Sequence, residues 1–373
     1  MSDLDRLSDD ERFLFDLVST QSVSGNERCA SEVFVRRASE LGFDAHIDEV
    51  ENAIAHRGPS DAPIHIVLLG HIDTVPGNIR VRVEDRILHG RGSVDAKGPL
   101  AAMLAGASRA ELPDGVRLSV IGAVGEEAAG SIGARHLVET MSPSACIIGE
   151  PSAWDGVTLG YKGRLIVDAS ASIGNHHSAG EDLSACDRVH GWWQRVLDHV
   201  NTFNDGRTRA FDRIQATILD MDSCTDGMTQ RANIRAGFRL PEDMGPAPLA
   251  WELSKLAQGE VRVECEGPEC AYATDNNDPV VRAIRCAIRE LGGTPRPKLK
   301  TGTADLNVVA PVWNCPIAAY GPGDSALDHT AHEHIDLDEF TRSIVVLESA
   351  IKLLADELVE SSIESKYTDQ AAI

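Results

Sequence analysis

Short, nearly continuous apolar runs alternate with amphipathic segments over the first 150 residues of the chain. The runs cover 63–70, 116–124 and 145–148. Runs of this kind are typical of strands that are buried on both faces of a parallel sheet. Four helices are expected between and before these strands. The first begins at Ser8 and the second near Ser24, and the other two cover 98–112 and 131–139. Strands that alternate with helices in this way predict an α/β fold with a mostly parallel sheet.

The pattern changes near residue 160. Residues 164–172 alternate between apolar and polar, as in an antiparallel strand with one wet face. The expected elements that follow are a helix over 183–200, strands over 210–220 and 230–240, and a helix over 249–257. The α/β style resumes with a helix over 279–291, a strand over 316–320 and a helix over 338–355. We therefore expect an inserted α+β domain at 161–277, within a larger domain made of 1–160 plus 278–373.

Each of the three apolar runs leads into glycine and then into a histidine or a carboxylate. The residues that follow the glycines are His71, Asp73, Glu126, Glu127 and Glu150. In open parallel sheets, ligands bind at the carboxyl ends of the strands. Imidazoles and carboxylates are the ligands of zinc and of similar hydrolytic metals. The strand ends therefore predict a metal site at one edge of the sheet.

Two further segments carry the same kinds of side chain. Asp95 lies on a glycine-rich loop just before an expected helix, and the C-terminal segment contains His329, His332 and His334. A single carboxylate before a helix is commonly an N-cap, and surface histidines occur by chance. Five groups of the right chemical type, all placed at turns, favour a shared metal centre over five separate structural roles.

Seven stretches in consistent order resemble one enzyme family over nearly the whole chain. They are GHIDTVPG (70–77), GRGSVDAKGPLAAML (90–104), GEEAAGSIGA (125–134), IIGEPS (147–152), the His-Ser step at 177–178, KTGTADLN (300–307) and GPGDSALDHTAHEHI (321–335). The chain thereby resembles the co-catalytic metallo-aminoacylase and carboxypeptidase family, which includes acetylornithine deacetylase and succinyl-diaminopimelate desuccinylase. The resemblance implies a two-metal amidohydrolase whose inserted domain is ferredoxin-like and forms a homodimer.

The resemblance assigns roles to the residues at the strand ends and loops. It implies that the metal ligands are His71, Asp95, Glu127, Glu150 and His329, with Asp95 bridging both ions. The spacing to the following Glu step matches His329 rather than His332 or His334. Glu126 is then the general base, and Asp73 orients the ring of His71. Two divalent ions are implied, Zn²⁺ or Co²⁺, because both suit the same ligands.

The inserted domain of this family supplies a histidine that reaches the partner subunit's active site and stabilises the oxyanion. His176 and His177 are the two candidates in this chain. We choose His177, because Ser178 follows it as in the family pattern. An exposed pair of loop histidines without this role is the alternative.

Substrate recognition is expected from a second loop and one arginine. The loop residues Lys300, Thr301, Gly302 and Thr303 replace the Gly-Gly-Thr-Asp loop that is common in the wider family. Arg239 matches the arginine of the family's Asp-x-Arg-x-Pro strand end and is positioned to clamp a carboxylate. A surface ion pair is an equally good explanation of Arg239, since glycine stands at position 237 where the family has Asp.

The same loop and the GPGDS segment resemble most closely the hydrolases that release lysine or ornithine from an amino-group carrier protein. We therefore expect that carrier as the macromolecular partner. Acetylornithine deacetylase and succinyl-diaminopimelate desuccinylase are the alternative activities. A binding protein that has kept the fold and lost activity is a more distant alternative, disfavoured because Glu126 and Asp95 are both present.

The composition of the chain narrows the kinds of binding partner and the cellular location that can be expected. The chain has 35 Lys and Arg against 58 Asp and Glu, for a net charge of −23. This charge excludes nucleic-acid binding through a general basic surface and disfavours anionic membranes. The charged N-terminus and the lack of long apolar runs indicate a cytoplasmic protein. Only 7 residues are Lys, which favours a salt-accumulating microbe over an ordinary acidic protein.

We predict that the melting temperature rises steeply between low salt and molar KCl. An excess of acidic groups repels itself in dilute buffer, and salt screens that repulsion. Thermal unfolding followed across a KCl series measures the effect. A melting temperature that does not change would contradict the halophilic interpretation and would leave the enzymatic one standing.

Overall fold

The computed structural model of the chain describes residues 3–371, with side chains for residues 4–363. The contacts divide the chain into two compact units. The first comprises Met1–Gly160, Thr274–Lys298 and Val308–Ile373, and the second Tyr161–Ala273 and Leu299–Asn307. Among the residues described, no helix is both long and apolar enough to cross a membrane.

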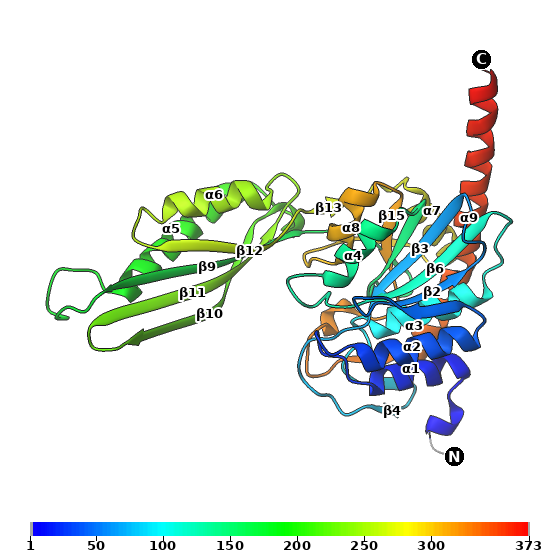
Figure 1. Cartoon of the computed structure of the whole chain (residues 1–373), viewed down its shortest axis with the longest axis horizontal. Coiled ribbons are helices and arrows are strands. Elements are labelled where there is room, and N and C mark those ends of the chain that lie inside the picture. Colours follow the sequence, from blue (N-terminus) through cyan, green and yellow to red (C-terminus); the bar gives the residue numbers. More distant parts are fainter. Residues whose placement is uncertain (1–2, 372–373) are drawn as a thin grey trace. The chain divides into compact units, whose positions relative to one another are not determined.

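The first unit is built on a mixed sheet in which the strands β1-β2-β6-β3-β7-β15-β8 lie in this order. Figure 1 labels β2, β6, β3 and β15 of this sheet. Its strands are β1 (Asp44–Ile47), β2 (Ala53–Arg57), β3 (Ile64–His71), β6 (Val116–Ala123), β7 (Ala145–Gly149), β8 (Gly156–Tyr161) and β15 (Ile317–Tyr320). The four central strands β6, β3, β7 and β15 run parallel, which confirms the predicted α/β fold. Their carboxyl ends therefore meet at one edge, where His71 lies opposite Ala123 and Gly70 opposite Gly149.

Helices cover this sheet and close its core. They are α1 (Asp9–Ser19), α2 (Arg28–Glu40), α3 (Lys97–Arg109), α4 (Ile132–Thr140), α7 (Pro279–Glu290), α8 (Asp305–Trp313) and α9 (Leu337–Ala371). α3 contacts β3, β6 and β7 on one side and α9 on the other. Its small residues explain this central position, since a Cβ on Gly106 would come within 2.8 Å of the Leu347 side chain. The helix that carries Lys97 just after Asp95 is thus fixed inside the core.

A small second sheet connects the C-terminal segment to the glycine-rich loop before α3. Its order is β16-β5-β4, with the strands β4 (Arg82–Glu84), β5 (Ile87–His89) and β16 (His334–Asp336). His334 lies opposite His89 in the antiparallel pair of β16 and β5. Segments almost 250 positions apart in the chain therefore lie side by side at this point.

The second unit contains an antiparallel sheet in the order β10-β11-β9-β12 (Figure 1). Its elements are β9 (Gly163–Gly174), β10 (Gln215–Thr225), β11 (Thr229–Leu240), β12 (Arg262–Glu269), α5 (Ala185–Asn204) and α6 (Pro246–Leu256). Two short strands, β13 (Tyr272–Ala273) and β14 (Arg296–Lys300), pair with β8 of the first sheet instead. Alternate residues of β9, beginning with Leu165 and Val167, are buried in one cluster with Trp192 of α5 and Leu253 of α6. The predicted alternation near residue 164 is therefore a strand with one face under helices.

Some predicted boundaries are wrong for identifiable reasons. The helix expected near Ser24 begins at Arg28, because the Ser24 hydroxyl donates a hydrogen bond to Asp73 (2.7 Å) and Gly25 takes a φ of +88°. The strand expected from residue 210 begins at Gln215, since Ala210–Asp212 forms a 3₁₀ turn. The helix expected to end near 355 continues in α9 to Ala371.

One buried hydroxyl in the first unit is shared by two imidazoles. Ser119 Oγ lies 2.7 Å from His56 Nδ1 and 2.7 Å from His65 Nε2. Burial, followed by the nearby charge of Arg117, lowers the pKa of both histidines to about 4. Both rings are therefore neutral in the folded chain over a pH range in which a solvated histidine carries a proton.

We predict that these two histidines make the fold acid-labile. Because their pKa is lowered in the folded state, the unfolded chain binds more protons, and the free energy of unfolding falls as the pH drops from about 6.5 to about 4. Linkage limits each contribution to about 1.4 kcal/mol per pH unit, reduced here by partial solvent contact. Urea unfolding in excess chelator should give a shallower pH dependence for His56→Gln/His65→Gln than for the exposed-site control His190→Gln. Parallel curves would contradict the prediction.

Candidate active site

His71 is the last residue of β3, and its buried ring is held by the segment that follows the strand. Its Nδ1 lies 3.0 Å from the carbonyl oxygen of Asp73 and therefore donates to it. The Asp73 carboxylate lies 3.5 Å from the same nitrogen. A hydrogen on Nδ1 leaves the Nε2 lone pair free to bind a metal, which is the usual arrangement for a ligand histidine.

Asp95 lies between two imidazoles. Its Oδ1 is 3.2 Å from His71 Nε2, and its Oδ2 is 3.0 Å from His329 Nε2. The carboxylate is almost fully buried, at the end of the glycine-rich loop that leads into α3. A carboxylate that faces two separate imidazole nitrogens, each able to bind its own metal ion, has the geometry required of a ligand that bridges two metal ions.

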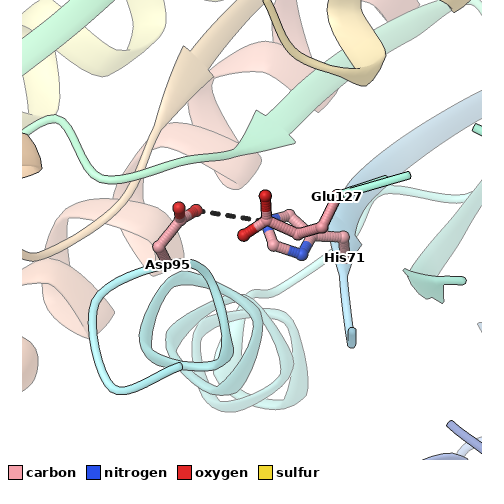
Figure 2. A group of neighbouring side chains, drawn as sticks. All are labelled: His71, Asp95 and Glu127. Atoms are coloured by element: carbon pink, nitrogen blue, oxygen red, sulfur yellow. Dashed lines mark hydrogen bonds and ion pairs between the residues drawn. The ribbon is translucent and has the colours of Figure 1, made fainter. Parts of the chain in front are cut away.

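Glu127 and Glu150 each lie near a different one of these two imidazoles. Glu127 Oε1 lies 3.0 Å from His329 Nε2, whereas Glu150 Oε1 lies 3.9 Å from His71 Nε2. Figure 2 shows Asp95, His71 and Glu127 pointing toward one another, and one ligand atom from each lies within 4.8 Å of the others. The cluster therefore offers two sets of donors that share Asp95.

Asp73 ties the strand that carries His71 to the turn that carries both glutamates. Its fully buried carboxylate accepts hydrogen bonds from the backbone N–H groups of Glu126 (3.1 Å) and Glu127 (3.0 Å). It also accepts the hydrogen bond from Ser24, a contact that the sequence analysis missed. The only sequence signal was the helix-breaking Ser-Gly step at 24–25. Asp73 therefore sets the orientation of the Glu126–Glu127 turn as well as that of His71.

The charges of the cluster show what kind of ligand it suits. Hydrogen bonds to Asp95 and then Glu127 raise the pKa of His329 to about 10. Burial lowers the pKa of His71, but its bonds to Asp73 and Asp95 outweigh this and carry it well above the usual value. Burial raises the pKa of Glu127. Without a cation, protons on imidazoles balance the buried carboxylates, and divalent cations would replace those protons.

The remaining predicted histidines lie outside the cluster. His332 is exposed, and His334 Nδ1 donates to the backbone oxygen of His332 (2.6 Å) while its ring contacts that of His89. His176 and His177 lie in the loop between β9 and α5 of the second unit, where His177 is exposed and His176 is half-buried. Among the three C-terminal histidines, the cluster therefore contains His329.

The predicted substrate residues come together within the second unit. Arg239 Nη1, near the end of β11, donates to Thr303 Oγ1 (2.7 Å), and that hydroxyl donates to the backbone oxygen of Lys162 (2.9 Å). Lys300 Nζ lies 5.6 Å from the centre of the Tyr161 ring. Thr301 is exposed, and a Cβ built on Gly302 would meet nothing within 4 Å. The Lys300–Thr303 loop is thus open on one side and bonded to Arg239 on the other.

Comparison with known proteins defines the family. The profile of Peptidase family M20/M25/M40 matches residues 67–353, and the chain belongs to this family. It is 44% identical over 344 residues to a LysW-lysine hydrolase of Deinococcus radiodurans, covering 90% of this chain and 94% of the relative. It is 40% identical over 346 residues to a putative LysW-lysine/LysW-ornithine hydrolase of Thermococcus kodakarensis, covering 92% of this chain and 91% of the relative.

Solved structures agree on the fold. An M20 family metallo-carboxypeptidase from Sulfolobus solfataricus matches with a TM-score of 0.76 at 16% identity, covering 94% of this chain and 100% of that one. A tripeptidase from Staphylococcus aureus matches with a TM-score of 0.76 at 19% identity, covering 95% and 100%. The chain is therefore a metal-dependent hydrolase with the M20 fold.

Proposed function

We propose that the chain hydrolyses the amide that joins the α-amino group of lysine or ornithine to the C-terminal glutamate of an amino-group carrier protein. The observation that carries the proposal is the buried cluster centred on Asp95, combined with 44% identity to a LysW-lysine hydrolase. The cluster supports amide hydrolysis, and the relatives support this particular amide. We further propose that the reaction takes place in the cytoplasm.

The donor set fits two divalent cations, for which we propose Zn²⁺, with Co²⁺ able to replace it. His71, Asp95 and Glu150 would hold one cation, and Asp95, Glu127 and His329 the other. When bound, such a pair supplies Lewis-acid chemistry, lowering the pKa of water and polarising a carbonyl. The two imidazoles and three carboxylates suit it because they mix nitrogen and oxygen donors at a mostly buried position.

Glu126 is the proposed general base. Its backbone N–H is fixed by Asp73, and its carboxylate lies close enough to act electrostatically on His71 without belonging to the ligand set. The Glu126 carboxylate takes one proton from the attacking water and delivers it to the amide nitrogen. The water oxygen bonds to the carbonyl carbon and the C–N bond then breaks, which leaves a carboxylic acid on the carrier and a free α-amino group on lysine or ornithine. The remaining proton of the acid passes to the amine, so that the products are a carboxylate and an ammonium group.

The hydrogen bonds of the inserted loop support His177 over His176 as the oxyanion donor. His177 Nδ1 accepts a hydrogen bond from Ala179 N–H (3.1 Å), so a neutral His177 carries its proton on Nε2. His176 Nδ1 instead donates to the backbone oxygen of His177 (3.4 Å), so a neutral His176 lacks a hydrogen on Nε2. An oxyanion needs a donor, and His177 Nε2–H is one that is free to point outward.

We propose that His177 acts in the partner subunit of a homodimer formed through the second unit. β10 is an edge strand of that unit, and edge strands present unpaired backbone groups that can pair with another chain. Its apolar side chains Ile218, Leu219 and Met221 are 37%, 55% and 53% exposed. Burial of these residues against a second copy would remove this apolar surface from water.

Arg239 and Lys300 are the proposed carboxylate-binding residues. The substrate carries at least the α-carboxylate of its lysine or ornithine, and a guanidinium binds a carboxylate in a fixed geometry. Thr303 holds Arg239 in place through its own bond to Lys162, so its hydroxyl acts through Arg239. Thr301 and Gly302 would form the open side of the loop.

One assay tests the proposed activity. Carrier-linked lysine, carrier-linked ornithine, acetylornithine and succinyl-diaminopimelate are offered side by side in high salt, and release of the free amine is measured. We expect carrier-linked substrates to be preferred. High salt is needed because a carrier with acidic surface would be repelled by a chain of net charge −23. Preference for either small substrate would overturn the proposal in favour of a biosynthetic deacylase.

A further inference from the structure

Two loops that approach the cluster from distant parts of the sequence are joined through Glu333. This residue follows the loop that contains His329 and directly precedes β16. Its Oε1 accepts hydrogen bonds from the backbone N–H groups of Val94 (3.0 Å) and Asp95 (3.1 Å). Its backbone oxygen accepts a third from Gly90 N–H (3.3 Å). Glu333 therefore holds both ends of the loop that carries the shared carboxylate.

The Glu333 carboxylate is completely buried and carries a charge that must be balanced inside the protein. Arg91 Nη1 donates to its second oxygen at 2.7 Å, and Arg91 Nε donates to the backbone oxygen of Gly77 (3.3 Å). A buried ion pair of this kind adds little to the free energy of unfolding, because the desolvation of both charges opposes their attraction. It does fix geometry, since each carboxylate oxygen has a defined set of donors.

The geometry that Glu333 fixes is that of the bridging carboxylate. With its N–H held, Asp95 directs one oxygen to His71 and the other to His329. The ring of His329 is held by Asp95 and Glu127, both at 3.0 Å, although its side chain is 52% exposed. Four residues later, Glu333 anchors the same loop in the core. Glu333 therefore connects the loop that carries Asp95 to the loop that carries His329, in addition to the direct contact between these two side chains.

We propose that Glu333 is a positioning residue for metal binding, which couples the loop of Asp95 to the loop of His329. The inference rests on the metal centre of the proposed function and is independent of which amide is cleaved. Loss of such supporting contacts lowers metal affinity about 10- to 100-fold in other metal sites. Glu333 touches none of the candidate ligands through their side chains, so it acts only through the backbone of Asp95 and through its own loop.

The test is a calorimetric titration of metal-free protein with Zn²⁺, without carrier or amino-acid substrate. In Glu333→Gln, the amide oxygen can still accept from the two N–H groups, but its NH₂ group faces the Arg91 guanidinium, so donor meets donor. We expect about 10- to 100-fold weaker binding. Glu333→Asp keeps the charge but is one methylene shorter and cannot reach Arg91 and both N–H groups together. Glu333→Asp should therefore also bind Zn²⁺ weakly. Weak binding in a variant that keeps the charge would show that the position of the carboxylate matters and not its charge alone.

Asp278→Asn is the matched control. Asp278 is a partly buried carboxylate that likewise accepts two backbone hydrogen bonds, from Val280 (2.8 Å) and Ile317 (3.2 Å), in the same unit. We expect it to lower the melting temperature and to keep wild-type Zn²⁺ affinity. Wild-type Zn²⁺ affinity in both Glu333 variants would overturn the proposal. An equal loss of Zn²⁺ affinity in Asp278→Asn would also overturn it, because the loss would then follow from lower stability of the fold in general. If Glu333→Gln does not fold, the Asp variant alone decides between these outcomes.

Discussion

Replacement of Glu126 by Gln is expected to lower kcat about 10²- to 10⁴-fold, the usual contribution of a general base, while the metal content stays unchanged. The amide is nearly isosteric with the carboxylate, so the turn held by Asp73 should keep its form. It cannot accept a proton from water at neutral pH, so both the activation of the nucleophile and the protonation of the leaving amine are lost. Steady-state kinetics and elemental analysis of the same preparation measure the two quantities.

Glu127→Gln is the control for this prediction, because the two residues are adjacent and both are held through their backbone by Asp73. Glu127 Oε1 contacts His329 and lies within the cluster, so its loss should reduce metal occupancy along with activity. The opposite pattern, with metal lost in Glu126→Gln and retained in Glu127→Gln, would show that base and ligand have been exchanged. Near wild-type kcat in Glu126→Gln would remove Glu126 from the reaction.

The sequence was most informative where one rule of parallel sheets applies. β3, β6 and β7 are neighbours that run in the same direction, so whatever follows their carboxyl ends lies at one edge. His71 ends β3, the Glu126–Glu127 pair comes just beyond the end of β6, and Glu150 directly follows β7. Their proximity could therefore be expected from hydrophobic runs alone. Asp95 was harder to place, because it lies on a loop and its role came from resemblance.

The contacts that sequence reasoning missed all join segments distant in the chain. The bond between Ser24 and Asp73 connects a turn before α2 to the end of β3, and nothing in local periodicity signals it. Glu333 was noted only as a spacing mark for His329, although it is fully buried. β16 and β5, which bring Glu333 to its partners, are too short to show an alternating pattern. Such positioning contacts depend on tertiary structure.

The second large effect concerns His177. We predict that His177→Ala lowers kcat about 10²- to 10³-fold, the usual loss for one oxyanion donor, with the metal content intact. His177 lies in an exposed loop of the second unit, outside the cluster of ligand candidates, so its removal should not disturb metal binding. His176→Ala is the matched control and should change kcat little, because the neutral His176 ring offers no Nε2 hydrogen. A large loss in His176→Ala instead would reverse the assignment.

A mixing experiment separates action across the proposed dimer from action within one subunit. Each homodimer of His177→Ala lacks the donor at both sites, and each homodimer of Glu126→Gln lacks the base at both sites. In a hybrid dimer, a histidine that crosses the interface gives one site with Glu126 from one chain and His177 from the other. Random exchange of subunits should then restore about a quarter of wild-type activity from two nearly inactive proteins. Differently tagged chains report whether hybrids form. If hybrids form and no activity returns, His177 does not serve the partner's site.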